Sequence, residues 1–200
     1  QVLRVGVQAM TVRMDRRAPI DLTFLVDTSG SMQRPDKIGL LKRTLRTLTE
    51  ELDDGDTVAI VAYAGPAGIV LPPTPMSRKQ QLLDALSRLN VGGSTAMGEG
   101  ISLAYELADS SYQDGGVNRV VIASDGDANV GAIDYRSLSA GIYDFAQRGI
   151  TLTTLGFGTG NYKDTIMERL ANDGDGNYYY IDSMDEARRI FVDRMHSTLQ

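Results

Sequence analysis

Residues 21–31 read Asp-Leu-Thr-Phe-Leu-Val-Asp-Thr-Ser-Gly-Ser, an apolar run followed directly by a polar loop. The first seven residues are almost continuously apolar, as expected of a strand in the middle of a parallel sheet. In open α/β sheets, ligands bind at the carboxyl ends of the strands. The stretch therefore predicts a central strand that ends in a candidate binding loop.

The rest of the chain alternates between apolar strands and amphipathic helices. Predicted strands cover residues 21–27, 57–63, 68–71, 119–124, 150–157 and 178–181, and Pro72-Pro73 is expected to end the third of them. Predicted helices follow Pro35, Ser77, the Gly92–Thr95 loop, Ser137, Asp164 and Ser183, and the two serines at 77 and 183 open capping boxes. This alternation predicts a mostly parallel sheet with helices on both faces.

Composition limits the function classes. The 200 residues suit one domain, and the net charge of −6 argues against nucleic-acid binding. The chain has no Cys, which excludes disulfides and thiol catalysis, and no apolar stretch long enough to span a bilayer. Because it begins at Gln1 inside an apparent strand, we expect a piece of a longer protein: residues 1–19 are predicted to be an N-terminal strand extension from a neighbouring region, and residues 20–200 to form the domain.

Oxygen-bearing side chains gather at the predicted strand ends. They are Asp27, Ser29 and Ser31 in the first loop, Thr95 in the glycine-rich loop, and Asp125 after a later strand. Carboxylates and hydroxyls suit Mg²⁺ or Mn²⁺, and Ca²⁺ less closely, whereas zinc prefers His and Cys. Two carboxylates only neutralise a divalent ion and leave positions open for water or an anionic group. A helix cap and turn is the alternative explanation of the first loop alone.

These residues also resemble a known motif. The Asp-x-Ser-x-Ser run at 27–31 is similar to the first segment of the metal-ion-dependent adhesion site (MIDAS) of von Willebrand factor type A domains. Thr95, in Gly-Gly-Ser-Thr-Ala-Met-Gly, and Asp125, in Ser-Asp-Gly, resemble the second and third segments. The family often has Gly-Gly-Thr in the second loop, so Ser94 is the alternative to Thr95. The resemblance covers residues 20–200 and is strongest to bacterial members related to YfbK and to calcium-activated chloride channel regulators.

The resemblance implies a Rossmann-like, three-layer fold whose mostly parallel sheet has one short antiparallel strand. It implies that Ser29 and Ser31 coordinate Mg²⁺ (or Mn²⁺, with Ca²⁺ possible) directly, and that Asp27, Thr95 and Asp125 act directly or through water. A protein partner would then complete the ion's coordination with an Asp or Glu side chain. A periplasmic or extracytoplasmic location is favoured by the same resemblance.

An enzyme is the main alternative, as a hydrolase or phosphotransferase that uses the same ion as a Lewis acid. Such an enzyme needs a base or nucleophile beside the metal. The sequence offers no His and no obvious Lys at this edge of the sheet, and Asp127 is the only plausible extra carboxylate. A haloacid-dehalogenase-like phosphatase would need Asp where Ser29 stands. The prediction is therefore a binding module without catalytic residues; a third interpretation is a structural domain whose metal only rigidifies the loops.

Two glycine-rich segments match ligand motifs poorly. Residues 156–160 read Gly-Phe-Gly-Thr-Gly, which lacks the Gly-x-Gly-x-x-Gly spacing of a dinucleotide loop. Residues 173–177 begin like a calcium loop, but Tyr178 and Met184 stand where an EF-hand needs Gly and Glu. Both segments are predicted to be turns, with a weak second cation site at Asp173 and Asp175 as the alternative.

Overall fold

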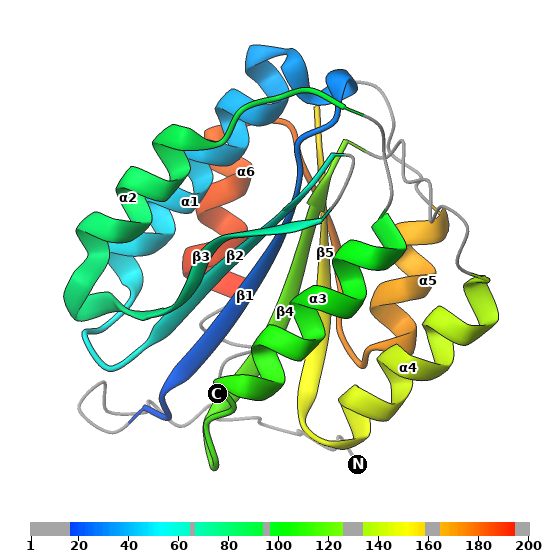
Figure 1. Cartoon of the computed structure of the whole chain (residues 1–200). Helices are drawn as coiled ribbons and strands as arrows, with labels where there is room; N and C mark the ends of the chain where they lie inside the picture. The colour runs from blue at the N-terminus through cyan, green and yellow to red at the C-terminus, as the bar shows by residue number, and fades with distance from the viewer. Residues whose placement is uncertain (1–16, 65–66, 94–96, 126–133, 159–164, 195–200) are drawn as a thin grey trace, which may run out of the picture.

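Six strands form one sheet at the centre of the computed structural model (Figure 1). The structure describes residues 17–64, 67–93, 97–125, 134–158 and 165–194. The order across the sheet is β3-β2-β1-β4-β5-β6. The strands are β1 (Ile20–Asp27), β2 (Thr57–Tyr63), β3 (Gly68–Pro75), β4 (Val117–Ser124), β5 (Ile150–Phe157) and β6 (Tyr178–Ile181).

Strand β1 lies in the interior of the sheet, and all eight of its residues are buried. It runs parallel to β2 on one side and to β4 on the other. Strands β5 and β6 continue the parallel arrangement, and only β3 is antiparallel to its neighbour. The predicted fold class, a mostly parallel sheet with one antiparallel strand, is confirmed.

Strand β3 differs from its prediction, because it continues through Pro72 and Pro73 to Pro75. It is an edge strand, where proline is tolerated since only one side of the strand has to form hydrogen bonds. The two prolines lie between the pairs Ile60–Leu71 and Val58–Thr74, where the register of the ladder shifts. The expectation that Pro72-Pro73 ends this strand was therefore wrong.

Helices cover both faces of the sheet and enclose two separate apolar cores (Figure 1). One face carries the apolar sides of α1 (Leu40–Glu51), α2 (Lys79–Arg88) and α6 (Met184–Arg188). The other carries α3 (Met97–Ser110), α4 (Tyr135–Gln147) and α5 (Thr165–Asp173). This three-layer arrangement agrees with the helices predicted from their apolar periodicity. Among the described residues, no helix is long and apolar enough to cross a membrane.

Short irregular turns precede several helices. A π-helical turn at Pro35–Gly39 leads into α1, and a second π-helical segment at Arg189–Arg194 follows α6. The capping box predicted at Ser77 is wrong, because a 3₁₀ turn at Met76–Arg78 occupies that place and its amides donate to backbone carbonyls of residues 54 and 56. The one predicted at Ser183 is confirmed in part: its hydroxyl accepts from the Glu186 amide, while the Glu186 carboxylate accepts from Arg189.

The predicted turns before and after β5 agree with the structure where it describes them. Gly149 closes α4 with a φ of 92° and donates to the Ala146 carbonyl. At the other end of β5, Gly158 has a φ of 123°. Residues 174–177 connect α5 to β6, and the Asp173 carboxylate accepts hydrogen bonds from Tyr135 and Ser139. Asp173 therefore joins α5 to α4.

Candidate metal centre

The candidate site lies at a topological switch point of the sheet. From β1 the chain builds outward through β2 and β3, whereas β4, β5 and β6 extend the sheet in the opposite direction. Ligands bind at such points, outside the carboxyl ends of the strands. Because Val26 of β1 is opposite Ala123 of β4, the next residues along, Asp27 and Ser124, come side by side at this edge.

Asp27 is fully buried and both of its carboxylate oxygens are hydrogen-bonded. Oδ1 accepts from the Ser29 amide at 2.8 Å, and Oδ2 accepts from the Ser124 hydroxyl at 2.9 Å. Burial raises the pKa of Asp27, the bonds from Ser29 and Ser124 oppose this, and the nearby charge of Asp125 adds to it. Each oxygen still has lone-pair capacity for a further ligand.

The first loop brings two hydroxyls together. Ser29 Oγ and Ser31 Oγ are 2.9 Å apart. A 3₁₀ turn at Gly30–Gln33 produces this arrangement, with the Met32 amide donating to the Ser29 carbonyl and the Met32 side chain fully buried. The buried methionine therefore anchors a loop whose hydroxyls face each other.

The second loop approaches the first through its glycines. The Gly92 amide donates to the Thr28 carbonyl at 2.8 Å. Gly93 has a φ of 104°, and a Cβ there would lie 2.4 Å from the Ala64 carbonyl oxygen, so only glycine fits. The predicted ligand Thr95, and its alternative Ser94, lie outside the described residues.

Asp125, the third predicted segment, is paired with a lysine that the sequence prediction missed. Lys37 Nζ lies 2.7 Å from Asp125 Oδ2 and also donates to the Ser31 carbonyl at 3.2 Å. The side chain of Asp125 is 1% exposed and that of Lys37 is 18% exposed. The expectation of no lysine at this edge was wrong, because 88 residues separate the partners and no local pattern indicates their contact.

Two further side chains at the site were not predicted. Ser124 donates to Asp27 across the β1–β4 pair, and Tyr63 is opposite Asp27 in the β1–β2 pair. The Tyr63 hydroxyl is fully buried; burial raises its pKa well above the usual value, and the charge of Asp27 adds to the effect. A polar residue closing an apolar strand was the available signal for Ser124, but its partner depends on which strands are neighbours.

The charges and donors described here fit a divalent cation. Within residues 17–64, 67–93, 97–125, 134–158 and 165–194, two buried carboxylates and two facing hydroxyls accompany one ammonium group, a surplus of one negative charge. The described residues contain no group of three His, Cys, Asp or Glu suited to a metal. Hydroxyls therefore have to supply part of any coordination, as hard cations accept. Asp127 lies outside the described residues.

Comparison with known proteins identifies relatives of the whole described fold. The family model "von Willebrand factor type A domain" matches residues 21–192. Protein YfbK of Escherichia coli (strain K12), described as uncharacterized, is 38% identical over 99% of this chain and 34% of its own length. Protein sll0103 of Synechocystis, also described as uncharacterized, is 29% identical over 94% of this chain and 44% of its own length. The chain thus spans less than half the length of either relative.

Solved structures share the fold at lower sequence identity. A von Willebrand factor type A structure from Catenulispora acidiphila superposes with a TM-score of 0.74 at 20% identity, covering 91% of this chain and 43% of that one. BatB from Bacteroides thetaiotaomicron has a TM-score of 0.72 at 22% identity, covering 89% and 99%. Proximal thread matrix protein 1 of the mussel byssus, solved "with zinc occupied MIDAS motif", has a TM-score of 0.70 at 20% identity, covering 92% and 46%.

Proposed function

Because the chain belongs to the von Willebrand factor type A family, we propose that the cluster at the ends of β1 and β4 is a MIDAS that binds Mg²⁺ or Mn²⁺ and, through the ion, an acidic side chain of a protein partner. One observation carries the proposal: at the switch point of the sheet, Asp27 of β1 lies close to Asp125, the residue after β4. Asp27 also accepts from the amide of Ser29, whose hydroxyl faces that of Ser31. The family typically mediates metal-dependent protein interactions.

The residues have distinct roles in this proposal. Ser29 and Ser31 supply hydroxyl ligands, with Thr95 as the third. Asp27 and Asp125 supply the charge that holds the ion, directly or through water. The bound ion would act as an electrophile that accepts a carboxylate from outside. The carboxylate of Asp27 has a second role, because its bond to the Ser29 amide fixes the shape of the loop.

A reaction is not part of the proposal. Domains of this family are usually non-catalytic. In the part of the chain that the structure describes, the additional nitrogen beside Asp125 is Lys37 Nζ, which donates to Asp125 and to the Ser31 carbonyl. A general base needs a free lone pair close to the substrate. If the protein were a hydrolase, it would hydrolyse p-nitrophenyl phosphate in the presence of the metal ion. We expect no such turnover.

Ion binding is the first test. Isothermal titration with Mg²⁺ and Mn²⁺ should show one site, and the ion should raise the melting temperature, since an ion at 100 times its Kd adds about 2.7 kcal/mol to the free energy of unfolding. Ser29→Ala should abolish both effects. The matched control is Ser102→Ala, because this serine bonds within α3 to the Gly98 carbonyl. No site in the wild-type protein would refute the proposal.

Zn²⁺ belongs in the same titration, because the mussel protein holds zinc in its MIDAS. The all-oxygen donors described here favour Mg²⁺ and Mn²⁺ by hardness, whereas the general affinity of protein sites is higher for Zn²⁺ than for Mn²⁺. If Zn²⁺ alone binds, the choice of ion is wrong although the site is real.

The acidic partner is tested with acetate as the simplest carboxylate. Replacing chloride by acetate at constant ionic strength should tighten Mn²⁺ binding, because a ligand that prefers the loaded site stabilises it. Chloride and methanesulfonate at equal concentration serve as anion controls. Mn²⁺ binding that does not respond to acetate would favour a purely structural ion.

A further inference from the structure

Lys37 lies where neither the family motif nor the sequence pattern places a functional residue. Its ammonium joins two of the three motif segments, because it donates both to Asp125 Oδ2 and to the Ser31 carbonyl. It comes from the π-helical turn Pro35–Gly39, a type of turn that is frequent at functional sites. We infer that Lys37 is a built-in counter-charge of the proposed metal site, which weakens ion binding but keeps the loaded site receptive to an acidic partner.

The lysine is held in position by its surroundings. Its aliphatic stem crosses Gly158 at the end of β5, where a Cβ would lie 3.2 Å from Lys37 Cε and 3.3 Å from Cγ. Glycine also permits the φ of 123° found there. Two hydrogen bonds fix the ammonium, and only 18% of the side chain is exposed. A surface lysine with free rotamers would have none of these restraints.

The pairing changes the charge of the site. Without Lys37, a divalent ion would be neutralised by Asp27 and Asp125. With Lys37 beside Asp125, the same assembly retains one positive charge. A neighbouring positive charge repels the ion, which lowers its affinity, and attracts an incoming carboxylate. The two effects have opposite signs, which separates this role from a structural one.

The pair also matters in the absence of an ion. The Asp125 side chain is 1% exposed, and its charge would lack this cation if Lys37 were removed. Removing one partner of a buried ion pair destabilises a protein, because the other charge stays buried. Lys37 therefore keeps the two acidic segments folded together before an ion arrives.

The inference rests on the proposed MIDAS and is tested with Lys37→Met, Lys37→Arg and the control Lys42→Met. Lys42 is another partly buried lysine that donates to a backbone carbonyl, that of Leu89. In Lys37→Met we expect a lower melting temperature in EDTA, Mn²⁺ binding about tenfold tighter in chloride, and at least a threefold loss of the enhancement by acetate. Lys37→Arg should resemble the wild type in the enhancement by acetate, and Lys42→Met should resemble it in every ion measurement.

The outcomes separate the inference from the function beneath it. If the wild-type protein binds no divalent ion, the proposed site and this inference both fail. If it binds Mn²⁺ but Lys37→Met binds with equal or lower affinity, only the inference fails. A change in EDTA stability without any change in Mn²⁺ or acetate binding would make Lys37 a structural residue and would also overturn the inference. Circular dichroism of Lys37→Met, with Lys37→Gln as a replacement if it fails to fold, checks the fold.

Discussion

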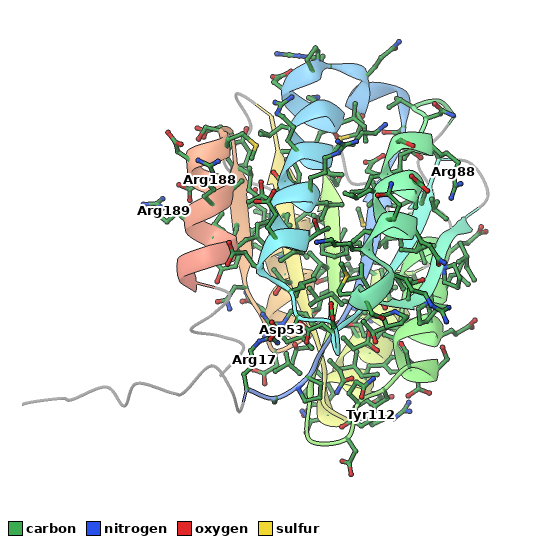
Figure 2. The ribbon with its side chains drawn as sticks, turned by 90° about the vertical axis from the view of Figure 1, so that its left-hand side faces the viewer. Arg17, Asp53, Arg88, Tyr112, Arg188 and Arg189 are labelled. Atoms are coloured by element: carbon green, nitrogen blue, oxygen red, sulfur yellow. The ribbon has the colours of Figure 1, made fainter. Side chains whose placement is uncertain are left out.

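The two ends of the sheet both bury aspartates but use them differently. At the amino ends of β1 and β2, the Asp56 carboxylate accepts from the Ile20 amide, the Asp53 amide and the Arg17 guanidinium. Arg17 also pairs with Asp53, and the two lie together near the lower end of the ribbon (Figure 2). At the carboxyl ends, Asp27 instead accepts hydrogen bonds from the Ser29 amide and the Ser124 hydroxyl.

The difference shows that burial of a carboxylate does not by itself mark a binding site. Asp56 has a charged partner and two amide donors, so its negative charge is compensated within the protein. The Asp27–Asp125 cluster has one ammonium for two carboxylates among the described residues, and its hydroxyls contact each other. The second carboxylate at each end differs in burial: the side chain of Asp53, which shares Arg17 with Asp56, is 71% exposed, whereas that of Asp125 is 1% exposed. Two buried carboxylates beside a single cation therefore distinguish the candidate ion site from the structural ion pair.

The strongest test of this contrast is Asp56→Ala. It would leave Arg17, the buried Ile20 amide and the partly buried Asp53 amide without their acceptor, so we expect a loss of about 4 kcal/mol in the free energy of unfolding. Urea denaturation measures the loss. Mn²⁺ affinity of the folded fraction should be unchanged; a parallel loss of ion binding would mean that the two ends are not independent.

The complementary change is Asp27→Asn. It should lower Mn²⁺ affinity by about 100-fold, as expected for loss of a carboxylate that binds or orients ligands. Stability in EDTA should rise, because burial raises the pKa of Asp27 and a neutral amide avoids that cost. Titration calorimetry and urea melts give the two values. A large loss of stability in EDTA would assign Asp27 to the same structural class as Asp56.

Asp21, at the amino end of β1, extends the comparison to pH. It is 2% exposed, neither carboxylate oxygen has a hydrogen-bond partner among the described residues, and burial raises its pKa to about 6. Because the folded-state pKa is above the unfolded value of 3.8, its contribution to stability is present below pH 4 and is lost as the pH rises through 6.

Asp21→Asn should therefore stabilise the protein at pH 8 by on the order of 2 kcal/mol and have almost no effect near pH 3.5. The measurement is the difference between wild-type and variant free energies of unfolding across this range, without added metal. A pH-independent difference would mean that the carboxylate has a partner in solution.

The smallest expected effect is that of Ser124→Ala. Losing its hydrogen bond to Asp27 should weaken Mn²⁺ binding by about tenfold. Thr154→Val is the matched control, since Thr154 is also buried in a parallel strand and donates to the Met167 carbonyl. Both variants should lose about 1 kcal/mol of stability. Equal Mn²⁺ affinities in the two variants would remove Ser124 from the site.

Much of the fold could be predicted because its elements are defined by local patterns. The strands at 57–63, 150–157 and 178–181 have the predicted bounds, since each is an apolar run closed by turn residues. The strand containing Pro72 and Pro73 was predicted too short, because proline ends a central strand but not an edge strand, and position in the sheet is not a local property.

The candidate site likewise has one part that the sequence predicts and another that depends on the tertiary structure. By itself the sequence determined the loop from Asp27 to Ser31, whose residues are two positions apart and interact within one turn, and it identified Asp125 as the polar end of a second strand. Only the tertiary structure decided that β4 lies beside β1, that Ser124 and Tyr63 adjoin Asp27, and that Lys37 pairs with Asp125. The physical reason is the distance in sequence over which each interaction acts. Periodicity and turn chemistry act over a few residues, whereas charge pairing depends on strand order and on chain segments far apart in sequence.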